Sequence, residues 1–327
     1  MSVISYWNTR KHKNSKIVYY TKNFFRYYVS SVFIVKRKAA YYLNTNSVDE
    51  EIIKRVNYYN KLGQIDPTVT EKMICLQDFI LPKKKKGVYS NRVYFFDSYE
   101  YTQFFDKNYK CEFLFGDIIH VPEIPSITKS RPIQGDNANS VLLNLDKVRH
   151  FMFLKDRKKF QDKKNLLVGR AYVRQPHRIK FWEMYFNHPM CNLGQINRNY
   201  ITNPEWIVEP MSIEEHLNFK FILCLEGNDV ASNLKWVMSS NSIAVMPEPK
   251  YETWFMEGTL IPDYHYIRIK DDYSDLEEKL NYYIEHTGEA LTIIENAHKY
   301  IDQFRNRKRE NLISKLVLAK YFKCTGQ

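Results

Sequence analysis

The second half of the chain alternates short apolar runs with helix-like segments, and this alternation narrows the folds it can adopt. Three apolar runs have the length of buried strands: residues 221–225 (FILCL), 242–246 (SIAVM) and 265–269 (HYIRI). Strands buried in a parallel sheet are nearly continuous apolar runs. When such strands alternate with helices, they predict a doubly wound α/β sheet.

Helices are predicted between and after these strands. Following the first strand, apolar residues recur at the spacing of one helix face: Val230, Leu234, Val237 and Met238. Following the third strand, Ser274 and Glu277 have the spacing of a capping box, in which two side chains bond the first free N–H groups of a helix. A further helix is predicted to carry four apolar residues: Leu291, Ile294, Ile301 and Phe304.

The first half of the chain is less regular. Residues 48–62 have the apolar period of a helix, whereas three segments are typical of strands: NRVYFF (91–96), CEFLF (111–115) and VLLNL (141–145). An α/β domain is expected here too. A chain of 327 residues suits two domains. The charged run KDRKKFQDKKN begins at residue 155, and we place the boundary there. We predict domains over 1–155 and 156–304, and a basic C-terminal helix over 305–327.

The chain is basic and rich in aromatic residues. Its formal net charge is +12, and it contains 25 Tyr and 20 Phe. A basic surface attracts nucleic acid, anionic lipid, or phosphorylated glycans and nucleotides. Lysine and arginine gather at 83–86, 155–164 and 305–309, which is also the pattern of an ordinary solubilising surface. One interpretation left open is therefore an aromatic-rich nucleic-acid-binding protein, although no known binding module is present.

The cysteines and the N-terminal sequence bear on location. Five scattered cysteines without a CxxC pair argue against a disulfide framework and against structural zinc. The first residues lack the apolar core of a signal peptide. Residues 17–35 are aromatic and apolar, but Lys22 and Arg26 interrupt them, so a spanning helix is not predicted. A core helix is the preferred interpretation and an interfacial helix the alternative. We expect a cytoplasmic protein.

A loop of eight residues, 226–233 (EGNDVASN), joins the first strand to the predicted helix. Free N–H groups at a helix N-terminus bind phosphate, and Gly227 lets the backbone approach a ligand closely. The alternative is a plain turn with Asp229 as the helix cap. A basic segment, LLVGRAYVRQPHR (166–178), contains Arg170, Arg174 and Arg178. The planar guanidinium group of arginine can donate paired hydrogen bonds to phosphate oxygens.

Asp117 follows the predicted strand CEFLF and a glycine. Ligands of α/β sheets bind where the strands end, so this carboxylate is a candidate base, and a cap is the alternative. Metal-binding and nucleophile motifs such as HExxH, GxSxG and DxD are absent from the sequence, so no metal cofactor is expected. Glu248 and Glu257 follow a strand, where donor ribose is often held, but eight residues lie between them and not the usual seven.

Three segments resemble glycosyltransferase family 90, in its bacterial lipopolysaccharide-A-type branch. They are KSRPI with NSVLLNLDKVRHF (129–151), FILCLEGNDVASNLKWVMSSNSIAVM (221–246) and YETWFMEGTLIPDYHYIRIKDDYSDLEEKL (251–280). The resemblance implies a GT-B fold, in which two Rossmann-like doubly wound domains face a cleft, here with C-terminal helices. It implies an inverting, metal-independent transfer from a UDP-sugar to a surface glycan such as the lipopolysaccharide core. The first domain would hold the acceptor and the second the donor.

The resemblance also implies roles for residues. Asp117 matches the family's general base, with Lys129, Ser130 and Arg131 on the acceptor side. The implied donor residues are Gly169, Arg170, Arg178, Gly227, Asn228, Asp229, Ala231, Ser232, Asn233, Lys235 and Glu257. Ala231 and Asn233 stand where the family often has serine and arginine, so the diphosphate is expected to rely on Lys235, Arg170 or Arg178. The implied partners are a nucleotide sugar, a glycan acceptor and an anionic membrane surface on the cytoplasmic side. An inactive membrane-surface adaptor of the same fold is a further alternative.

Overall fold

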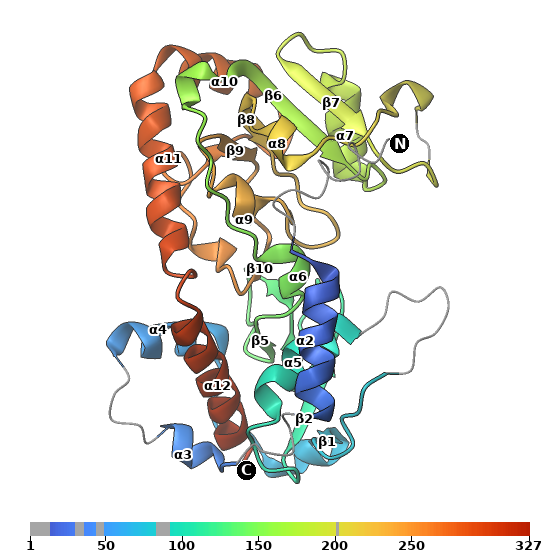
Figure 1. The fold of residues 1–327 in the computed structure, drawn as a ribbon, viewed down its shortest axis with the longest axis vertical. Helices are drawn as coiled ribbons and strands as arrows, with labels where there is room; N and C mark the ends of the chain where they lie inside the picture. Colours follow the sequence, from blue (N-terminus) through green and yellow to red (C-terminus); the bar gives the residue numbers. More distant parts are fainter. Residues whose placement is uncertain (1–13, 30–35, 44–48, 83–91, 201–202) are drawn as a thin grey trace. The chain divides into compact units, whose positions relative to one another are not determined.

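The computed structural model describes residues 14–29, 36–43, 49–82, 92–200 and 203–327. They form two compact units, each taken by itself below (Figure 1). The described part of unit 1 is Arg149–Pro249 with Thr259–Gln303, and unit 2 is Asn14–Val148 with Lys250–Gly258 and Phe304–Gln327. The basic run 83–86 lies outside the described residues.

Unit 1 is built on a five-stranded sheet in which every pairing is parallel, as the apolar runs predicted. The strands are β6 (Lys164–Ala171), β7 (Cys191–Gln195), β8 (Phe219–Leu223), β9 (Ile243–Met246) and β11 (Ile267–Arg268). Their order across the sheet is β11-β9-β8-β6-β7. Strand β7 therefore lies on one side of β6, and the next strand along the chain, β8, lies on the other side. The strand order reverses here, so the switch point of the sheet lies between β6 and β8.

Helices connect and cover these strands. They are α6 (Lys147–His150), at the boundary with unit 2, α7 (Pro176–Tyr185), α8 (Ile213–His216), α9 (Leu234–Val237), α10 (Leu276–Glu285) and α11 (Thr287–Asp302), with 3-10 turns at η3 (Phe160–Asp162) and η4 (Pro204–Trp206). Side chains of the strands and helices share one apolar core that includes Leu167, Phe221, Val245, Phe181 and Leu280. The predicted capping box is wrong: Asp275 is the N-cap of α10 and bonds the Lys270 N–H instead.

Unit 2 contains a smaller sheet in the order β1-β2-β3-β5. Its strands are β1 (Ile74–Cys75), β2 (Lys110–Leu114), β3 (Ser126–Thr128) and β5 (Ser140–Leu142), and β4 (Ser130–Pro132) pairs separately with β10 (Tyr251–Thr253). Pairing is parallel from β2 to β5, but β1 is antiparallel. No helix connects β2, β3 and β5 within the fully described stretch 110–142. Unit 2 is therefore α/β but does not have the predicted Rossmann-like winding.

The helices of unit 2 come from both ends of the chain. They are α2 (Lys16–Tyr28), α3 (Ala39–Leu43), α4 (Glu50–Tyr59), α5 (Arg92–Thr102) and α12 (Arg307–Cys324), with 3-10 turns η2 (Pro67–Lys72) and η5 (Glu257–Thr259), the latter ending in unit 1. The strand predicted at 91–96 is wrong, because residues 92–96 begin α5, while residue 91 lies outside the described part of the chain. Arg55 of α4 forms a buried ion pair with Glu310 of α12, at 2.5 Å. The predicted C-terminal helix is thus packed into unit 2.

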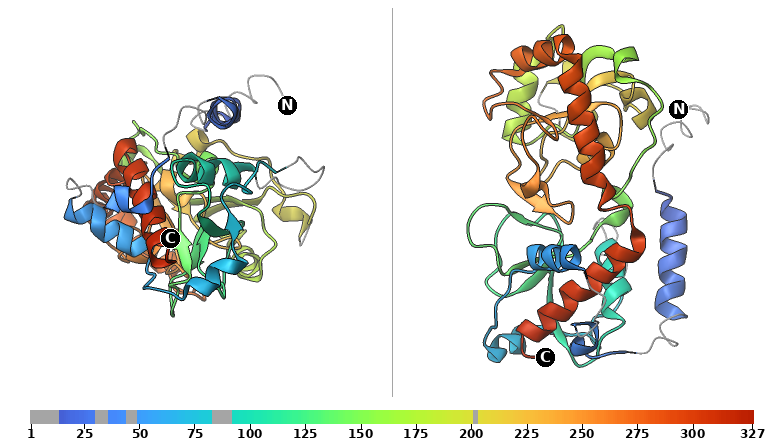
Figure 2. Two further views of the ribbon diagram at one scale, coloured as in Figure 1. Left: turned by 90° about the horizontal axis from the view of Figure 1, so that it is seen from below. Right: turned by 90° about the vertical axis from the view of Figure 1, so that its left-hand side faces the viewer.

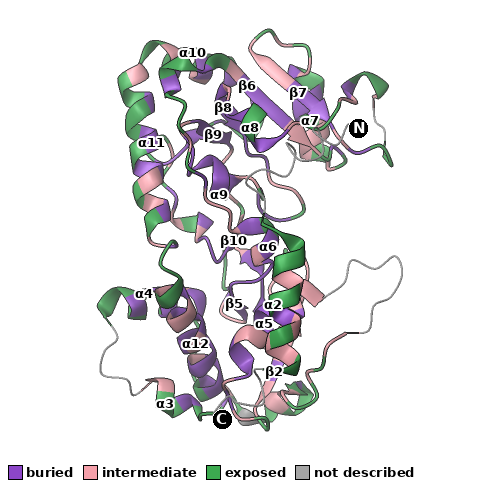
Figure 3. Cartoon of the chain, in the orientation of Figure 1, coloured by how far each residue is buried: buried purple, intermediate pink, exposed green. Residues whose placement is uncertain are grey.

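Helix α2 occupies the first part of the stretch 17–35, for which a core helix was the preferred interpretation, and residues 30–35 lie outside the described residues. Its inner side packs on α5, where Phe24 meets Phe96 edge to face and Tyr19 donates to Asp97 at 2.8 Å. Yet Asn23 is its only buried residue. Figures 2 and 3 show α2 beside the rest of its unit, with much of its surface exposed. The core-helix interpretation is therefore wrong for the outer side of α2.

Candidate active site

The switch point of unit 1 brings together two segments singled out in the sequence, the arginine-rich segment after β6 and the glycine loop after β8. Both follow the carboxyl ends of adjacent parallel strands, which pair through Leu167 and Phe221. The strand order reverses here, and ligands of open α/β sheets bind at such points. The topology therefore places the predicted donor loop where a ligand crevice is expected.

Arg178, in the first turn of α7, clamps this loop. Its guanidinium donates hydrogen bonds of 2.8 Å each to the carbonyl oxygens of Tyr172, Leu225 and Glu226. Burial lowers the pKa of Arg178 to about 10; the ring of Tyr273 works against this shift and the charge of Arg174 adds to it. The side chain therefore stays charged at neutral pH and ties the start of α7 to the end of β8.

Two further side chains of α7 and its cap reach the same loop. The His177 ring hydrogen-bonds the Glu226 carbonyl at 2.8 Å, and Gln175 donates to the side-chain oxygen of Asn228 at 3.1 Å. Gly227 lies directly over Arg178, since a Cβ there would sit 3.4 Å from a guanidinium nitrogen. The loop is thus held from one side by α7, and exposed Asn228 marks its open side.

The rest of the loop differs from the prediction. The helix after Gly227 begins only at Leu234 and has four residues, so Val230 is not part of its apolar face. The loop N–H groups are therefore not those of a long helix. Asp229 and Ala231 are buried and Ser232 is exposed. Asn233, at the place of the family arginine, donates to the Leu223 carbonyl at 2.9 Å, which folds the loop back onto β8.

Three other predicted donor residues lie on or beside the strands. Arg170 donates to the backbone carbonyl and side-chain oxygen of Asn192, at 2.8 and 2.7 Å, so it joins β6 to β7. Burial lowers its pKa, against the charge of Glu215. A Cβ on Gly169 would lie 3.0 Å from the Leu193 side chain, so close packing alone favours glycine here. Lys235 is fully buried in α9, and its charge reaches Cys224 at the end of β8.

Arg174 was noted in the sequence but not included among the predicted site residues. It is exposed, and it lies close enough to Arg178 for its charge to lower the pKa of that residue. It therefore adds an accessible positive charge beside the loop. The signal for it was the even spacing of three arginines at positions 170, 174 and 178.

Glu257 belongs to the other unit. Both of its carboxylate oxygens accept hydrogen bonds from Thr253, from the backbone N–H at 2.6 Å and the hydroxyl at 2.9 Å. Glu257 is 1% exposed. In this conformation it stabilises the turn after β10, and a role in holding the donor stays a prediction.

Unit 2 places Asp117 where a general base is expected, just beyond the carboxyl end of β2. Gly116, with φ of 126°, turns the chain immediately before it, a conformation that side-chain-bearing residues rarely adopt. Lys129 follows the neighbouring parallel strand β3, and its ammonium lies 2.5 Å from the Asp117 carboxylate. The lysine side chain is 2% exposed and the aspartate 31%. The ion pair therefore holds the carboxylate while leaving one side of it open.

The other two residues predicted on the acceptor side are turned inward. The Ser130 hydroxyl accepts from the Ile118 N–H at 3.1 Å and donates to the Ile118 carbonyl at 3.0 Å, which fixes the loop next to Asp117. Arg131 is fully buried and donates to Glu252 at 2.8 Å and to the Tyr58 carbonyl at 2.7 Å. They support the site from behind in this structure.

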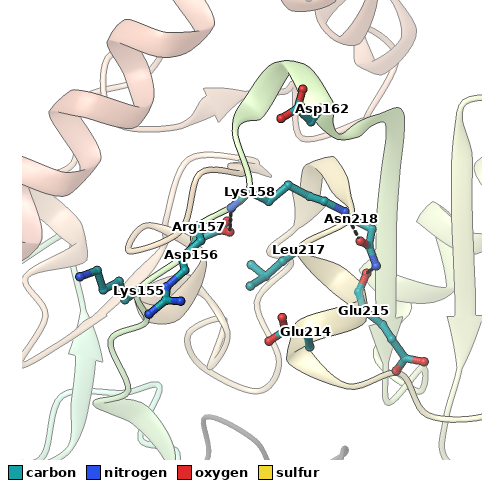
Figure 4. A pocket seen from close by; sticks show the side chains of 9 residues that line it. All are labelled: Lys155, Asp156, Arg157, Lys158, Asp162, Glu214, Glu215, Leu217 and Asn218. Atoms are coloured by element: carbon teal, nitrogen blue, oxygen red, sulfur yellow. Dashed lines mark hydrogen bonds between the residues drawn. The ribbon is translucent and has the colours of Figure 1, made fainter.

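A cavity of about 910 Å³ lies elsewhere in unit 1, before the amino ends of β6 and β8 (Figure 4). Lys158 donates to Asn218 across it, and Glu214 and Glu215 of α8 form another side. It contains none of the predicted site residues. Across the described ranges, no group of three or more His, Cys, Asp or Glu side chains is arranged to hold a metal ion.

Comparisons with known proteins show what this chain is similar to. The sequence profile of a family described as "Glycosyl transferase family 90" matches residues 155–323. The chain is 40% identical over 272 residues to "O-glucosyltransferase LpsA" of Dichelobacter nodosus, a match that covers 83% of this chain and 82% of the relative. It is also 27% identical over 124 residues to "Uncharacterized protein 179R" of Invertebrate iridescent virus 6, covering 34% of this chain and 10% of that protein.

Proposed function

Since the chain belongs to glycosyl transferase family 90 and is a glycosyltransferase, we propose that it transfers a sugar from a UDP-sugar to a surface glycan, with inversion and without a metal ion. The observation that carries this proposal is the clamp of Arg178 on the Gly227 loop at the switch point of unit 1. It supplies a rigid loop and fixed positive charge at the edge of the sheet where nucleotides bind in α/β folds.

The leaving group is a nucleoside diphosphate, which gains negative charge as the bond to the sugar breaks. Transferases that use no metal need protein groups to stabilise that charge. We assign this role to Arg178 and the exposed Arg174, with the backbone of Gly227 and Asn228 approaching the diphosphate. Lys235 is buried, and we assign it to stabilising the loop. Arg170 bonds Asn192 of the neighbouring strand, and we assign it to stabilising the sheet.

Asp117 is the proposed general base. The acceptor hydroxyl oxygen attacks the anomeric carbon from the face opposite the UDP oxygen, the new C–O bond forms as the old one breaks, and the hydroxyl proton passes to the carboxylate. Asp117 is partly open to solvent and fixed by Lys129, as a base for an incoming hydroxyl needs to be. Lys129 and Ser130 are then positioning residues.

The acceptor is proposed from the resemblance of the sequence to the lipopolysaccharide-A-type branch of the family. The Dichelobacter nodosus protein is called an O-glucosyltransferase, and we propose a lipopolysaccharide-core glycan as acceptor. We further propose that it acts on the cytoplasmic side of the membrane. All five cysteines are free thiols, which fits a reducing compartment. The nucleic-acid-binding and inactive-adaptor interpretations are not retained, because the family is one of enzymes.

Isothermal titration with UDP, with and without a chelator, tests the donor proposal, and a transfer assay with a panel of UDP-sugars and a core oligosaccharide tests the activity. We expect UDP to bind equally well in both titrations. Binding only in the presence of a divalent metal would overturn the metal-free mechanism. Binding of UDP without transfer to any core oligosaccharide would support the donor proposal and overturn the proposed acceptor.

A further inference from the structure

Helix α2 has an outward side that is largely apolar. Four of its exposed residues and the one that follows it are hydrophobic or aromatic, with exposed fractions of 78% for Ile17, 66% for Val18, 60% for Phe25, 63% for Tyr28 and 43% for Val29. At about 100° per residue, these five positions fall within an arc of roughly 120°, and the exposed Thr21 is the one polar residue inside it. A helix on the surface of a globular protein normally turns polar residues outward.

The opposite side of α2 is already in use, so the helix cannot bury its outer side by rotating. Tyr27 packs edge to face on Phe95 and Tyr99, and Phe24 on Phe96. Arg26 pairs with Glu100 of α5 at 2.6 Å. Within its own unit, α2 is therefore fixed with its apolar arc facing solvent, as the exposed surface in Figure 3 shows.

The charges around this arc are positive. The helix contains Lys16, Lys22 and Arg26 and no acidic residue. Lys22 is exposed and borders the arc, and Arg307, at the start of α12, lies near enough for its charge to act on Lys22. Arg307 and its neighbours Arg305 and Lys308 are exposed as well. An apolar strip bordered by lysine and arginine complements a surface that is apolar inside and negatively charged outside.

We propose that the outer face of α2, defined by Ile17, Val18, Phe25, Tyr28 and Val29, docks on an anionic lipid bilayer. The helix lies in the plane of the interface, with the apolar side chains among the upper acyl chains and Lys22 at the headgroups. Tyrosine and phenylalanine suit this depth, because their rings are favourable at membrane interfaces. The described chain holds no helix long and apolar enough to cross a membrane, and docking requires none. This inference does not depend on the donor or the acceptor proposed above.

Co-sedimentation of the full chain with phosphatidylcholine vesicles, with and without phosphatidylglycerol, tests this inference. We expect binding to the anionic vesicles that weakens as salt rises. The double variant Val18→Ser/Phe25→Ser should lose at least about tenfold in partitioning, while its melting temperature stays unchanged, because both side chains are exposed. The matched control is Ile53→Ser/Ile261→Ser, which removes two exposed isoleucines elsewhere, 49% and 53% exposed, and should bind as the wild type does.

Three results would overturn the inference. The first is a wild type that sediments with neither kind of vesicle. The second is a Val18→Ser/Phe25→Ser variant that binds anionic vesicles as tightly as the wild type, which would leave basic charge alone as the cause. The third is a concentration-dependent dimer, seen by analytical ultracentrifugation without lipid and abolished by the same variant, in a protein that does not bind vesicles. In that case a second copy of the chain covers α2.

Discussion

The guanidinium of Arg178 lies against Gly227, close enough that a Cβ on the glycine would sit 3.4 Å from its nearest nitrogen. The two residues are far apart in sequence, and each was a separate candidate for binding phosphate. Their contact turns two weak motifs into one site, because the arginine both holds the loop that carries the glycine and brings a positive charge beneath it.

Replacing Arg178 with lysine should loosen this clamp. Lysine keeps the charge but offers a single nitrogen, which cannot reach the carbonyls of Tyr172, Leu225 and Glu226 together. We expect the free energy of unfolding to fall by about 1–3 kcal/mol and UDP to bind at least about tenfold more weakly. Chemical denaturation and titration calorimetry measure the two effects. Glu183→Ala, exposed on the same helix, is the control and should change neither.

Gly227→Ala should separate binding from folding. The added methyl group makes an ordinary contact with Arg178 at 3.4 Å, so the melting temperature should change little. If the backbone of Gly227 must approach the diphosphate, the same methyl group blocks that approach, and UDP affinity should fall by about tenfold. An alanine variant that binds UDP as the wild type does would show that no ligand comes close to this position.

Arg174→Ala tests the accessible charge beside the loop. Arg174 is exposed, so its loss should leave stability within about 0.5 kcal/mol of the wild type. UDP affinity should drop by roughly five- to tenfold, and the difference from wild type should shrink as salt rises, because exposed charges are screened. Titrations at low and high salt check this. An affinity loss that is independent of salt would point to a contact other than charge.

Asp117→Asn should abolish transfer and spare donor binding. The amide keeps the shape of the side chain but cannot take the acceptor proton, so we expect the rate to fall by at least about 100-fold. UDP affinity should hold, because the proposed donor residues belong to the other unit. The variant removes the Asp117 charge that pairs with the buried Lys129 ammonium, so the assay is run well below the measured melting temperature. Near wild-type transfer by a folded variant would exclude Asp117 as the base.

Glu100→Gln should lower stability in a pH-dependent way. Burial opposes ionisation of Glu100, but the charges of Lys147 and Arg26 outweigh it and lower the pKa to about 2. Because the folded pKa is below the usual 4.5, the carboxylate stabilises the folded state above pH 4.5, and this contribution is lost as the pH falls toward 2. At neutral pH we expect a loss on the order of 3 kcal/mol in the variant.

Denaturation of wild type and variant from neutral to acid pH checks this, since the two stabilities should converge as the pH falls. Burial raises the pKa of Asp97 to about 6, so its own contribution to stability falls as the pH rises, opposite to that of Glu100, and Asp97 is present in both proteins. Glu278→Gln, exposed on α10, is the control. An equal difference in the free energy of unfolding between this control and the wild type would refute the explanation. A difference between Glu100→Gln and the wild type that persists below pH 2 would refute it as well.

The sequence alone predicted the centre of the unit 1 sheet well, because β8 and β9 are buried along their whole length. The runs at 221–225, 242–246 and 265–269 became β8, β9 and β11 within two residues or so of their expected starts. The strand predicted at 91–96 failed because its continuous apolar and aromatic run, Val93 to Phe96, also fits a helix that packs rings on two sides, as Phe95 and Phe96 do in α5. Tertiary packing decided between these two structures.

The site was predictable in its parts but not in its assembly. Local sequence pointed to Gly227, Arg178 and Asp117, since each follows a strand end. It could not show that Arg131 turns inward to Glu252, because those residues are brought together only when β4 pairs with β10. Nor could it show that the helix after Gly227 shortens to four residues, since Asn233 bonds the Leu223 carbonyl and not the helix.

The packing of α12 into unit 2 has a consequence for the order of events during synthesis. The ion pair from Arg55 to Glu310 and the hydrogen bond from Asn60 to the Val317 carbonyl, at 3.1 Å, join the early part of the chain to its last helix. Unit 2 therefore cannot close until the ribosome has delivered α12. Most of unit 1 has emerged by then and can fold first. A nascent chain halted just before residue 307 should hold an ordered unit 1, whereas proteases should still cleave its unit 2.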